Sequence, residues 1–365
     1  MNQNYYQPVS KQVYNLYIDR YKESVLSKLP PAAHKIDKIA YIGAGLMVEN
    51  LKNPDDEFSG FIPPKEAKEY SKKVYGYAEG IGITGNRTPE GYLIEDIEIR
   101  SDTYEQGIRA GDIILKIDEK KVTGLSDEEL HNLLYPALGT IINLEILHPV
   151  KEKIAKYKVE CKKFFKETVS DIPTKIPYVF CLKIEKFNKK TAEDLKRYLA
   201  DFLKGKIELL IMDLRDNPGG PPLAVHELSG IFLEPKTKLF YYKKRKEIVA
   251  ALTAPESEVQ YQGPLAVLIN KGSGSASELL AATFKEYGRA LVCGKEKSAG
   301  FTFLKHAYDF DDGSMLTLIT GFAYLASGTK LETEGVQPDY SVPEEASDIL
   351  QFVLNKFKKG QLPLK

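Results

Sequence analysis

Unbroken apolar runs and amphipathic stretches alternate along the chain from about residue 166 onward. Residues 207–215 and 264–270 are mainly apolar and show almost no alternation with polar residues, which is typical of strands buried on both faces of a parallel sheet. Each run is followed by an apolar sequence with helical spacing, over 222–233 and 275–288. This order of elements predicts an α/β core with a mostly parallel sheet over residues 166–345.

The remaining chain divides into three parts by its pattern. Residues 76–165 contain short strand-like runs, glycine-rich turns and one helical stretch that begins after Ser126, which predicts a small separate domain. Residues 1–75 have helical spacing broken by two Pro-Pro pairs, and they predict an N-terminal helical segment. Residues 346–365 predict a terminal amphipathic helix.

The charge balance and the few cysteines and histidines exclude several classes of protein. The 365 residues carry 51 basic and 51 acidic side chains, which excludes a globally basic nucleic-acid binder. The three cysteines are far apart, which argues against a disulfide framework and against a zinc site of thiolates. The five histidines form no close pair, so no metal site is expected. No apolar run is long enough to predict a membrane span, and the first residues do not resemble a signal peptide.

The turn after the first apolar run is a candidate oxyanion hole. Residues 213–220 read Asp-Leu-Arg-Asp-Asn-Pro-Gly-Gly. Gly219 and Gly220 would let the backbone approach a ligand closely and point amide groups at developing negative charge. A tight turn that requires a positive φ is the alternative explanation of this motif.

The turn after the second apolar run carries three serines. Small residues place Ser275 at the start of a helix, where the helix dipole favours an oxyanion and the Ala276 amide is a natural donor. Ser275 is therefore a candidate nucleophile. The alternative is that Ser273, Ser275 or Ser277 only caps the helix, with Glu278 as its partner.

These motifs together resemble the carboxyl-terminal processing peptidases, also called tail-specific proteases. The resemblance covers roughly residues 40–345 and rests on MDLRDNPGG, on GSGSASE with the helix after it, and on DGSMLTLITGFAYLASGTKLETEGVQPD. The segment GIGI at 80–83, followed by GIRAGDIILKIDEKKVTGLSDEEL, is similar to the PDZ domain of this family. The resemblance implies a serine peptidase core of the ClpP/crotonase-like type with an inserted PDZ domain, and no metal or organic cofactor.

The resemblance implies catalytic roles for four residues. Ser275 matches the family's nucleophile. Ala276, with Gly219 or Gly220, matches the amides of the oxyanion hole. The reaction implied is hydrolysis of a peptide bond through acyl transfer to Ser275.

The resemblance also implies partners and a location. The PDZ domain would bind the C-termini of proteins or peptides as an added strand, while backbone amides hold the terminal carboxylate. The residues that match this binding loop are Gly80, Ile81, Gly82 and Ile83. Export to the periplasm or cell envelope and assembly into a homo-oligomer are further expectations from the family.

The position of the catalytic base is atypical. The family commonly uses a lysine with a glutamine four residues later, and Gly300 and Leu304 stand at these positions. A serine needs a base to become a nucleophile, so another residue would have to serve. Lys297 and His306 are weak candidates close to this segment in the sequence.

A second branch of the family, of the tricorn type, uses a serine, a histidine and a glutamate. This chain looks closer to that branch, because residues 298–300 resemble its TAG-like triplet and Glu332 stands where its glutamate does. The branch's histidine position holds Phe58, which cannot accept a proton. His226 and His34 are more remote candidates for the base.

Two hypotheses therefore stand. In the first, the chain is a serine peptidase with an atypical or displaced base that cleaves proteins recognised by their C-terminal tail. In the second, it is a catalytically inactive relative that binds peptide tails or a small apolar ligand, as the retinoid-binding relatives of the family do. The intact serine and glycine motifs favour the first, and the missing base favours the second.

Overall fold

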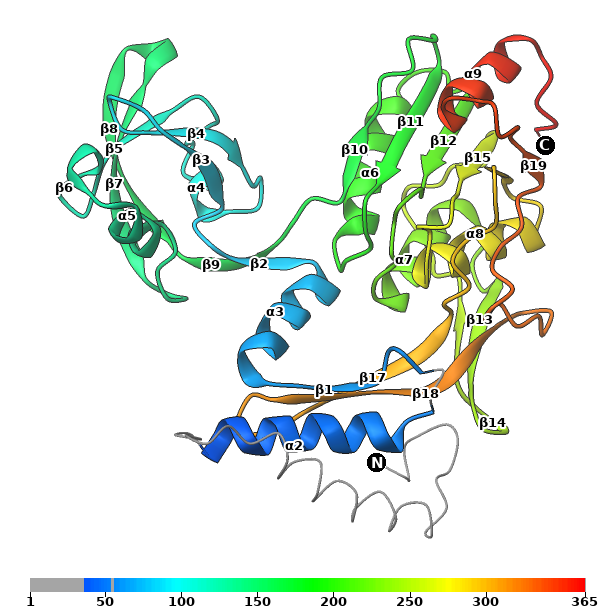
Figure 1. Ribbon diagram of the computed structural model, residues 1–365. Helices are drawn as coiled ribbons and strands as arrows, with labels where there is room; N and C mark the ends of the chain where they lie inside the picture. Colours follow the sequence, from blue (N-terminus) through cyan, green and yellow to red (C-terminus); the bar gives the residue numbers. More distant parts are fainter. Residues whose placement is uncertain (1–35, 54–55, 365) are drawn as a thin grey trace.

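The computed structural model describes residues 36–53 and 56–364 (Figure 1). The helical pattern expected near the start of the chain, and His34, lie outside these residues. None of the helices in the described residues is long and apolar enough to cross a membrane.

A six-stranded sheet forms the centre of the core. Its strand order is β10-β11-β12-β15-β16-β19, and only β10 runs antiparallel to its neighbour. The two apolar runs that predict buried strands lie at β12 and β15, and every residue of both strands is buried. The strands span Val169–Asp171 (β10), Val179–Ile184 (β11), Leu209–Asp213 (β12), Leu265–Leu268 (β15), Leu291–Gly294 (β16) and Tyr340–Ser341 (β19).

Helices cover both faces of this sheet. Leu210 and Met212 of β12 face a core built with three helices, whereas Leu209 and Ile211 face the C-terminal helix. Because both faces are covered, the strands need no polar side, which explains their unbroken apolar sequence. The three helices are α6 (Thr191–Phe202), α7 (Pro222–Phe232) and α8 (Ala276–Glu286), and the C-terminal helix is α9 (Ile349–Lys358).

A second sheet, which the sequence pattern did not predict, is antiparallel. It joins the N-terminal part of the chain to the core, because β1 (Gly60–Ile62) pairs with β18. The expected N-terminal helical segment therefore contains a strand between α2 (Ile36–Leu51) and α3 (Pro64–Tyr75). The other strands are β13 (Lys238–Lys244), β14 (Glu247–Thr253), β17 (Phe303–Asp309) and β18 (Met315–Leu325), paired in the order β14-β13-β18-β17.

Residues 77–165 form a unit with its own hydrophobic core, built around Ile94, Ile114 and Ile146 (Figure 1). The helix expected after Ser126 is present as α5 (Asp127–Leu134), and the Ser126 hydroxyl accepts the Glu129 N–H at 3.2 Å. The unit's other elements are β3 (Ile83–Arg87), β4 (Tyr92–Ile97), α4 (Asp102–Glu105), β5 (Ile113–Ile117), β6 (Lys120–Lys121), two 3-10 turns (Val122–Gly124 and Pro149–Lys151), β7 (Ile141–His148) and β8 (Lys153–Glu160).

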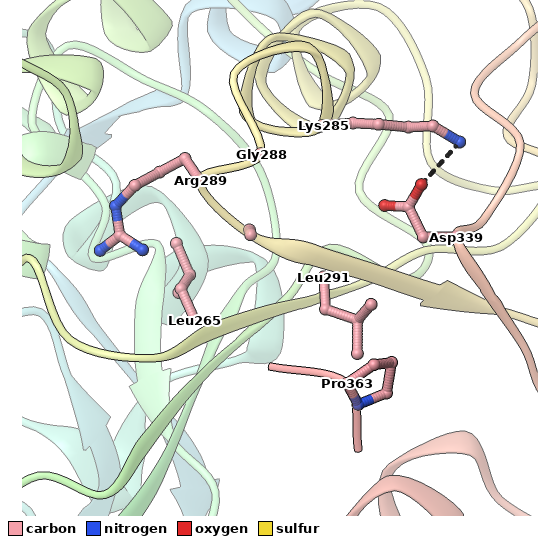
Figure 2. A pocket seen from close by; sticks show the side chains of 8 residues that line it. Leu265, Lys285, Gly288, Arg289, Leu291, Asp339 and Pro363 are labelled. Carbon is pink, nitrogen blue, oxygen red and sulfur yellow. Dashed lines mark ion pairs between the residues drawn. The ribbon is translucent and has the colours of Figure 1, made fainter. Parts of the chain in front are cut away.

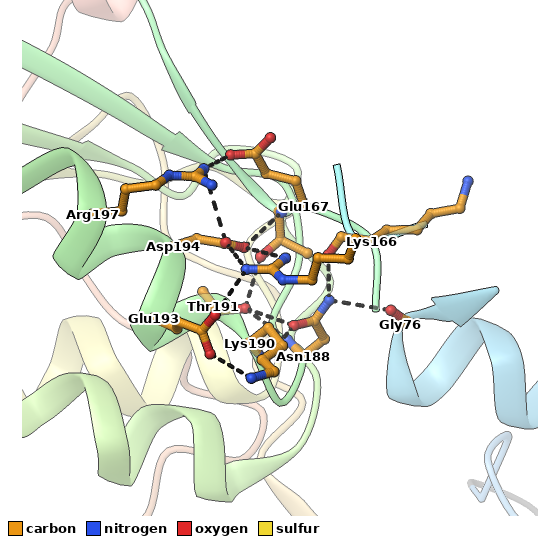
Figure 3. A network of polar contacts seen from close by, with 11 residues as sticks. Gly76, Lys166, Glu167, Asn188, Lys190, Thr191, Glu193, Asp194 and Arg197 are labelled. Atoms are coloured by element: carbon orange, nitrogen blue, oxygen red, sulfur yellow. Dashed lines mark hydrogen bonds and ion pairs between the residues drawn. The ribbon is translucent and has the colours of Figure 1, made fainter. Parts of the chain in front are cut away.

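A two-stranded ribbon of β2 (Tyr77–Gly80) and β9 (Lys162–Phe165) connects this unit to the core. At the base of the ribbon, the Asn188 side-chain amide donates to the carbonyl oxygens of Gly76 at 3.1 Å and Lys166 at 2.8 Å (Figure 3). A single side chain of the core therefore holds both ends of the insertion.

Candidate active site

The junction between β15 and α8 gives Ser275 an unusual backbone conformation. Ser275 is the N-cap of α8 and has φ 52° and ψ −114°. A non-glycine residue with positive φ costs on the order of 1–3 kcal/mol and persists only where its surroundings hold it. Here Glu278 holds it, because the Glu278 carboxylate accepts the Ser275 N–H at 2.9 Å and the Glu278 N–H donates to the Ser275 carbonyl at 3.0 Å.

The three serines of this turn have different environments. Ser273 and Ser277 are fully buried, and their hydroxyls donate to the backbone carbonyls of Leu214 at 2.8 Å and Asn217 at 2.9 Å. Of the three, only Ser275 is half-buried and reaches solvent. Ser273 and Ser277 thus stabilise the turn, and Ser275 is the hydroxyl available for chemistry.

The glycine turn packs directly against the serine turn. A methyl group at Gly219 would lie 2.7 Å from the Ser275 Cβ and 2.8 Å from the Ala276 nitrogen, so only glycine fits there. The Gly219 N–H donates to the Asn217 side chain at 2.9 Å, which removes it from the expected oxyanion hole. Within the described residues, the Gly220 and Ala276 N–H groups have no hydrogen-bond acceptor. These two groups are the open donors beside Ser275.

Asn217 connects the two turns, a role that the sequence analysis missed. Its side-chain amide donates to the Ile184 carbonyl at 2.8 Å, and its own carbonyl accepts the Gly274 N–H at 2.9 Å in addition to the Ser277 hydroxyl. Asn217 is fully buried. An asparagine between a buried strand and Pro-Gly-Gly was the available signal, since a buried amide must find several partners.

Glu278 is a second residue whose role the sequence analysis understated. Its fully buried carboxylate accepts four hydrogen bonds: from Ser275 N at 2.9 Å, Ser298 Oγ at 2.6 Å, Gly300 N at 2.6 Å and Phe301 N at 2.8 Å. Beyond capping α8, it therefore fixes residues 298–301 beside the serine turn. Burial raises the pKa of Glu278, and the four donors only partly oppose this effect.

The raised pKa predicts a pH-dependent contribution of Glu278 to stability. The folded state binds the proton more readily than the unfolded chain, whose carboxyl titrates near 4.5. The contribution is therefore fully present below that pH and is lost as the pH rises through the folded-state pKa. Urea unfolding of the wild type and Glu278→Gln across this range should show the wild type losing stability relative to the variant. A constant difference would contradict the prediction.

The structure does not bring the expected base candidates to Ser275. Lys297 Nζ donates to the Thr333 carbonyl at 3.0 Å, and His306 Nδ1 is 2.7 Å from Thr320 Oγ1. Burial, with a contribution from the charge of Lys244, lowers the pKa of His306. None of the hydrogen bonds and ion pairs of the described residues joins either candidate to Ser275.

Two further residues that the sequence places in the catalytic machinery, Glu332 and His226, also lie away from Ser275 in their contacts. Glu332, the expected acid, forms an ion pair with Lys330. His226 lies within α7, and its buried Nδ1 has no hydrogen-bond partner among the described residues. Neither residue contacts Ser275 through a hydrogen bond or ion pair in the described part of the chain.

An aromatic cluster surrounds Phe58, the residue at the position where the sequence analysis expects a histidine in the related branch. The Phe58 ring packs against Phe301 and Phe303, with centroid distances of 5.1 and 4.5 Å. Phe301 is adjacent to the serine turn, because its N–H and the Ser275 N–H donate to the same oxygen of Glu278. The position expected for a base therefore holds an aromatic ring that cannot take a proton.

The expected tail-binding loop lies at the start of an edge strand. Gly82 has φ 76°, and a methyl group there would lie 2.2 Å from the Ser101 Cβ, so the turn requires glycine. Ile81 and Ile83 are buried in the unit's core, and Gly80 precedes them with φ 148°. Strand β3 is at the edge of its sheet.

A cavity of about 300 Å³ lies elsewhere in the core and excludes Ser275 (Figure 2). Its charged groups are already engaged, since Lys285 pairs with Asp339 at 3.0 Å and Arg289 donates to the carbonyls of Phe232 and Tyr261. Because Ser275 does not line it, this cavity is separate from the serine turn.

The chain is similar to several known proteins. Residues 179–342 match the model of peptidase family S41. A probable CtpA-like serine protease of Staphylococcus saprophyticus is 26% identical over 339 residues, which cover 91% of this chain and 67% of the relative. A probable CtpA-like serine protease of Staphylococcus aureus is 26% identical over 328 residues, covering 89% of this chain and 64% of the relative. The chain thus spans about two thirds of the length of these relatives.

A solved structure supports the fold. The photosystem II D1 C-terminal processing protease superposes with a TM-score of 0.51 at 20% identity, covering 96% of this chain and 93% of that protein. The mixed α/β architecture, the match over the core and the serine at the strand–helix junction lead to one conclusion. Residues 179–342 form a domain of peptidase family S41, and most of the chain is similar to CtpA-like serine proteases.

Proposed function

We propose that this chain hydrolyses peptide bonds through an acyl-enzyme formed on Ser275. The observation that carries the proposal is the pair of open N–H donors, Gly220 and Ala276, beside a serine held in a strained conformation. The Ser275 oxygen adds to the carbonyl carbon of the substrate, and the two N–H groups donate hydrogen bonds to the resulting oxyanion. The amine then leaves with a proton, and water hydrolyses the ester.

We expect peptide hydrolysis by this chain to be slow. Because no lysine or histidine of the described residues contacts Ser275, its proton passes to water rather than to a positioned base. A positioned general base typically contributes about 10²–10⁴-fold to the rate. The oxyanion hole alone accelerates peptide hydrolysis less. A covalent active-site label can still detect a reactive Ser275, because it does not depend on turnover.

Labelling with a fluorophosphonate tests the proposal. We expect the reagent to modify wild-type protein at Ser275 and to leave Ser275→Ala unlabelled. Ser327→Ala, which removes an exposed serine elsewhere, is the matched control and should label like the wild type. Mass spectrometry of the labelled peptide identifies the modified residue. Equal background labelling of wild type and Ser275→Ala would reject the proposal.

We further propose that residues 77–165 act as a PDZ domain that selects substrates by their C-terminal tail. The free edge of β3 offers backbone groups to an added strand, and the loop from Gly80 to Ile83 offers amides to a carboxylate. A nest of backbone amides binds an anion far better than a neutral amide.

Amidating the C-terminus of a bound peptide should therefore weaken its binding at least about tenfold, since one charge-assisted interaction is lost. Fluorescence anisotropy with a labelled peptide measures the change. Acetylating the N-terminus of the same peptide is the control and should leave the affinity unchanged. Equal affinity for the free acid and the amide would contradict tail recognition.

The second candidate function is binding without catalysis. The aromatic ring of Phe58 at the expected histidine position favours it, because the site then lacks a proton acceptor and gains apolar surface. Tail binding together with absent labelling of Ser275 would support this candidate over the first.

A further inference from the structure

One face of the antiparallel sheet carries a continuous row of aromatic rings. The inner face of β13 and β18 packs into the core through Phe240, Tyr242, Ala323 and Leu325. Because side chains alternate along a strand, the residues between them lie on the outer face. We call this row the aromatic track, and it consists of Phe58, Phe301, Phe303, Phe322, Tyr324 and Tyr241.

The strand register places neighbouring rings of the track side by side. Phe303 of β17 is opposite Phe322 of β18, and Tyr324 of β18 is opposite Tyr241 of β13. The two tyrosine rings stack with their centroids 5.5 Å apart and their planes 10° from parallel. The Phe58 ring bridges Phe303 to Phe301.

The track begins at the serine turn. The N–H groups of Phe301 and Ser275 share one oxygen of Glu278, so these two residues lie side by side. The Phe301 side chain is 46% exposed, and the other five rings are half-buried. A solvent-accessible aromatic surface therefore leads from the nucleophile across three strands.

Lysine side chains lie over the outer part of the track. Lys243 Nζ is 5.4 Å from the Tyr241 centroid and 4.9 Å from the Tyr324 centroid. Lys330 Nζ is 3.9 Å above the Phe322 ring and pairs with Glu332, so the positive charge of the track comes mainly from Lys243. The track thus combines apolar ring faces with positive charge, and such a surface fits large apolar side chains interspersed with acidic ones.

We propose that the aromatic track binds the substrate polypeptide in an extended conformation on one side of the scissile bond, and that it selects chains rich in large apolar and acidic residues. This inference rests on the proposed function for its catalytic meaning. An extended chain repeats its same-side residues every ~7 Å, which lets alternate side chains reach successive rings. The track is continuous with the serine turn, so a chain bound there leads its peptide bonds to Ser275.

Binding to a catalytically silenced protein tests the inference without relying on turnover. The probe is a fluorescein-labelled peptide of about 20 residues with phenylalanine at alternate positions and aspartate between some of them, amidated at its C-terminus. Amidation keeps the expected tail-binding loop out of the measurement. The Ser275→Ala protein should bind this probe, by anisotropy, at least tenfold more tightly than a peptide in which serine replaces each phenylalanine.

Two variants in the Ser275→Ala background locate the binding surface. Replacing Tyr241 and Tyr324 together by serine should weaken binding of the probe at least tenfold. Lys243→Glu, which keeps both rings, should weaken it severalfold, and the loss should shrink when asparagine replaces aspartate in the probe. Tyr178→Ser, at a tyrosine that is 52% exposed outside the track, is the matched control and should bind normally.

The outcomes separate this inference from the proposed function. Loss of binding in the track variants supports the inference even where fluorophosphonate fails to label Ser275, a failure that rejects the proposed function alone. Unchanged binding in both track variants overturns the inference even where Ser275 is labelled. A concentration-dependent dimer that Tyr324→Ser dissociates would identify a second copy of the chain as the occupant and would also overturn it.

Discussion

Replacing Phe58 by histidine is expected to raise the rate at which a fluorophosphonate labels Ser275 by about 10²-fold or more, the lower end of what a positioned general base contributes. Phe58 is in contact with Phe301, whose amide shares a carboxylate oxygen with that of Ser275. An imidazole there would be the only histidine brought close to the serine turn among the described residues. The rate should fall as the pH drops through the histidine pKa, because only neutral imidazole accepts the proton.

Phe61→His is the matched control for this gain of function. Phe61 lies in the adjacent strand β1 and stacks on Tyr41 with a centroid distance of 6.0 Å, and it makes no ring contact with the cluster at Phe301. The control should label at the wild-type rate. An unchanged rate in a folded Phe58→His protein would mean that position 58 cannot serve Ser275, and it would weaken the catalytic interpretation of the whole site.

Glu278→Ala is expected to lower the free energy of unfolding by roughly 3–5 kcal/mol, because it breaks a buried hydrogen-bond network. The substitution leaves four donors without an acceptor, and each unpaired buried donor costs about 1–3 kcal/mol when the structure cannot relax. It also releases the amide that holds Ser275 at positive φ. Labelling of Ser275 should therefore fall even at temperatures where the variant stays folded.

Urea unfolding and labelling together test this second prediction. Glu286→Ala is the matched control, because Glu286 lies in the same helix and, among the described residues, its carboxylate accepts a single hydrogen bond, from Ser327 N at 2.9 Å. We expect it to cost about 1 kcal/mol or less. A Glu278→Ala protein as stable as this control, with full labelling, would show that the serine turn does not depend on the buried carboxylate.

The sequence was sufficient to predict the elements that depend on local pattern. The strands at Leu209–Asp213 and Leu265–Leu268 and the helix at Ala276–Glu286 follow from unbroken apolar runs and helical spacing. The place of Ser275 at a strand–helix junction follows with them. The match of residues 179–342 to peptidase family S41 agrees with the family resemblance that the sequence motifs indicate.

What escaped prediction depends on contacts between distant residues. The antiparallel sheet forms by pairing β1 with β18 across more than 250 positions, as in Gly60 opposite Thr317, and no local pattern specifies such a partner. Glu278 has the sequence signature of a helix cap, yet its three partners at Ser298, Gly300 and Phe301 come from another segment. The Gly219 amide was an expected oxyanion donor, and the neighbouring Asn217 side chain occupies it.

Asn188 binds both ends of the insertion formed by residues 77–165, and this has a consequence for how the protein is organised. The Lys166 N–H donates to the Gly76 carbonyl at 3.2 Å, so the chain leaves the core and returns to it at nearly the same point. A segment anchored in this way is an independent insertion. The strand order of the core stays the same when the segment is lengthened, replaced or deleted. Under the proposed function, one recognition unit can be replaced by another at this insertion point while the serine turn keeps its geometry, so that a change of substrate requires no change at Ser275.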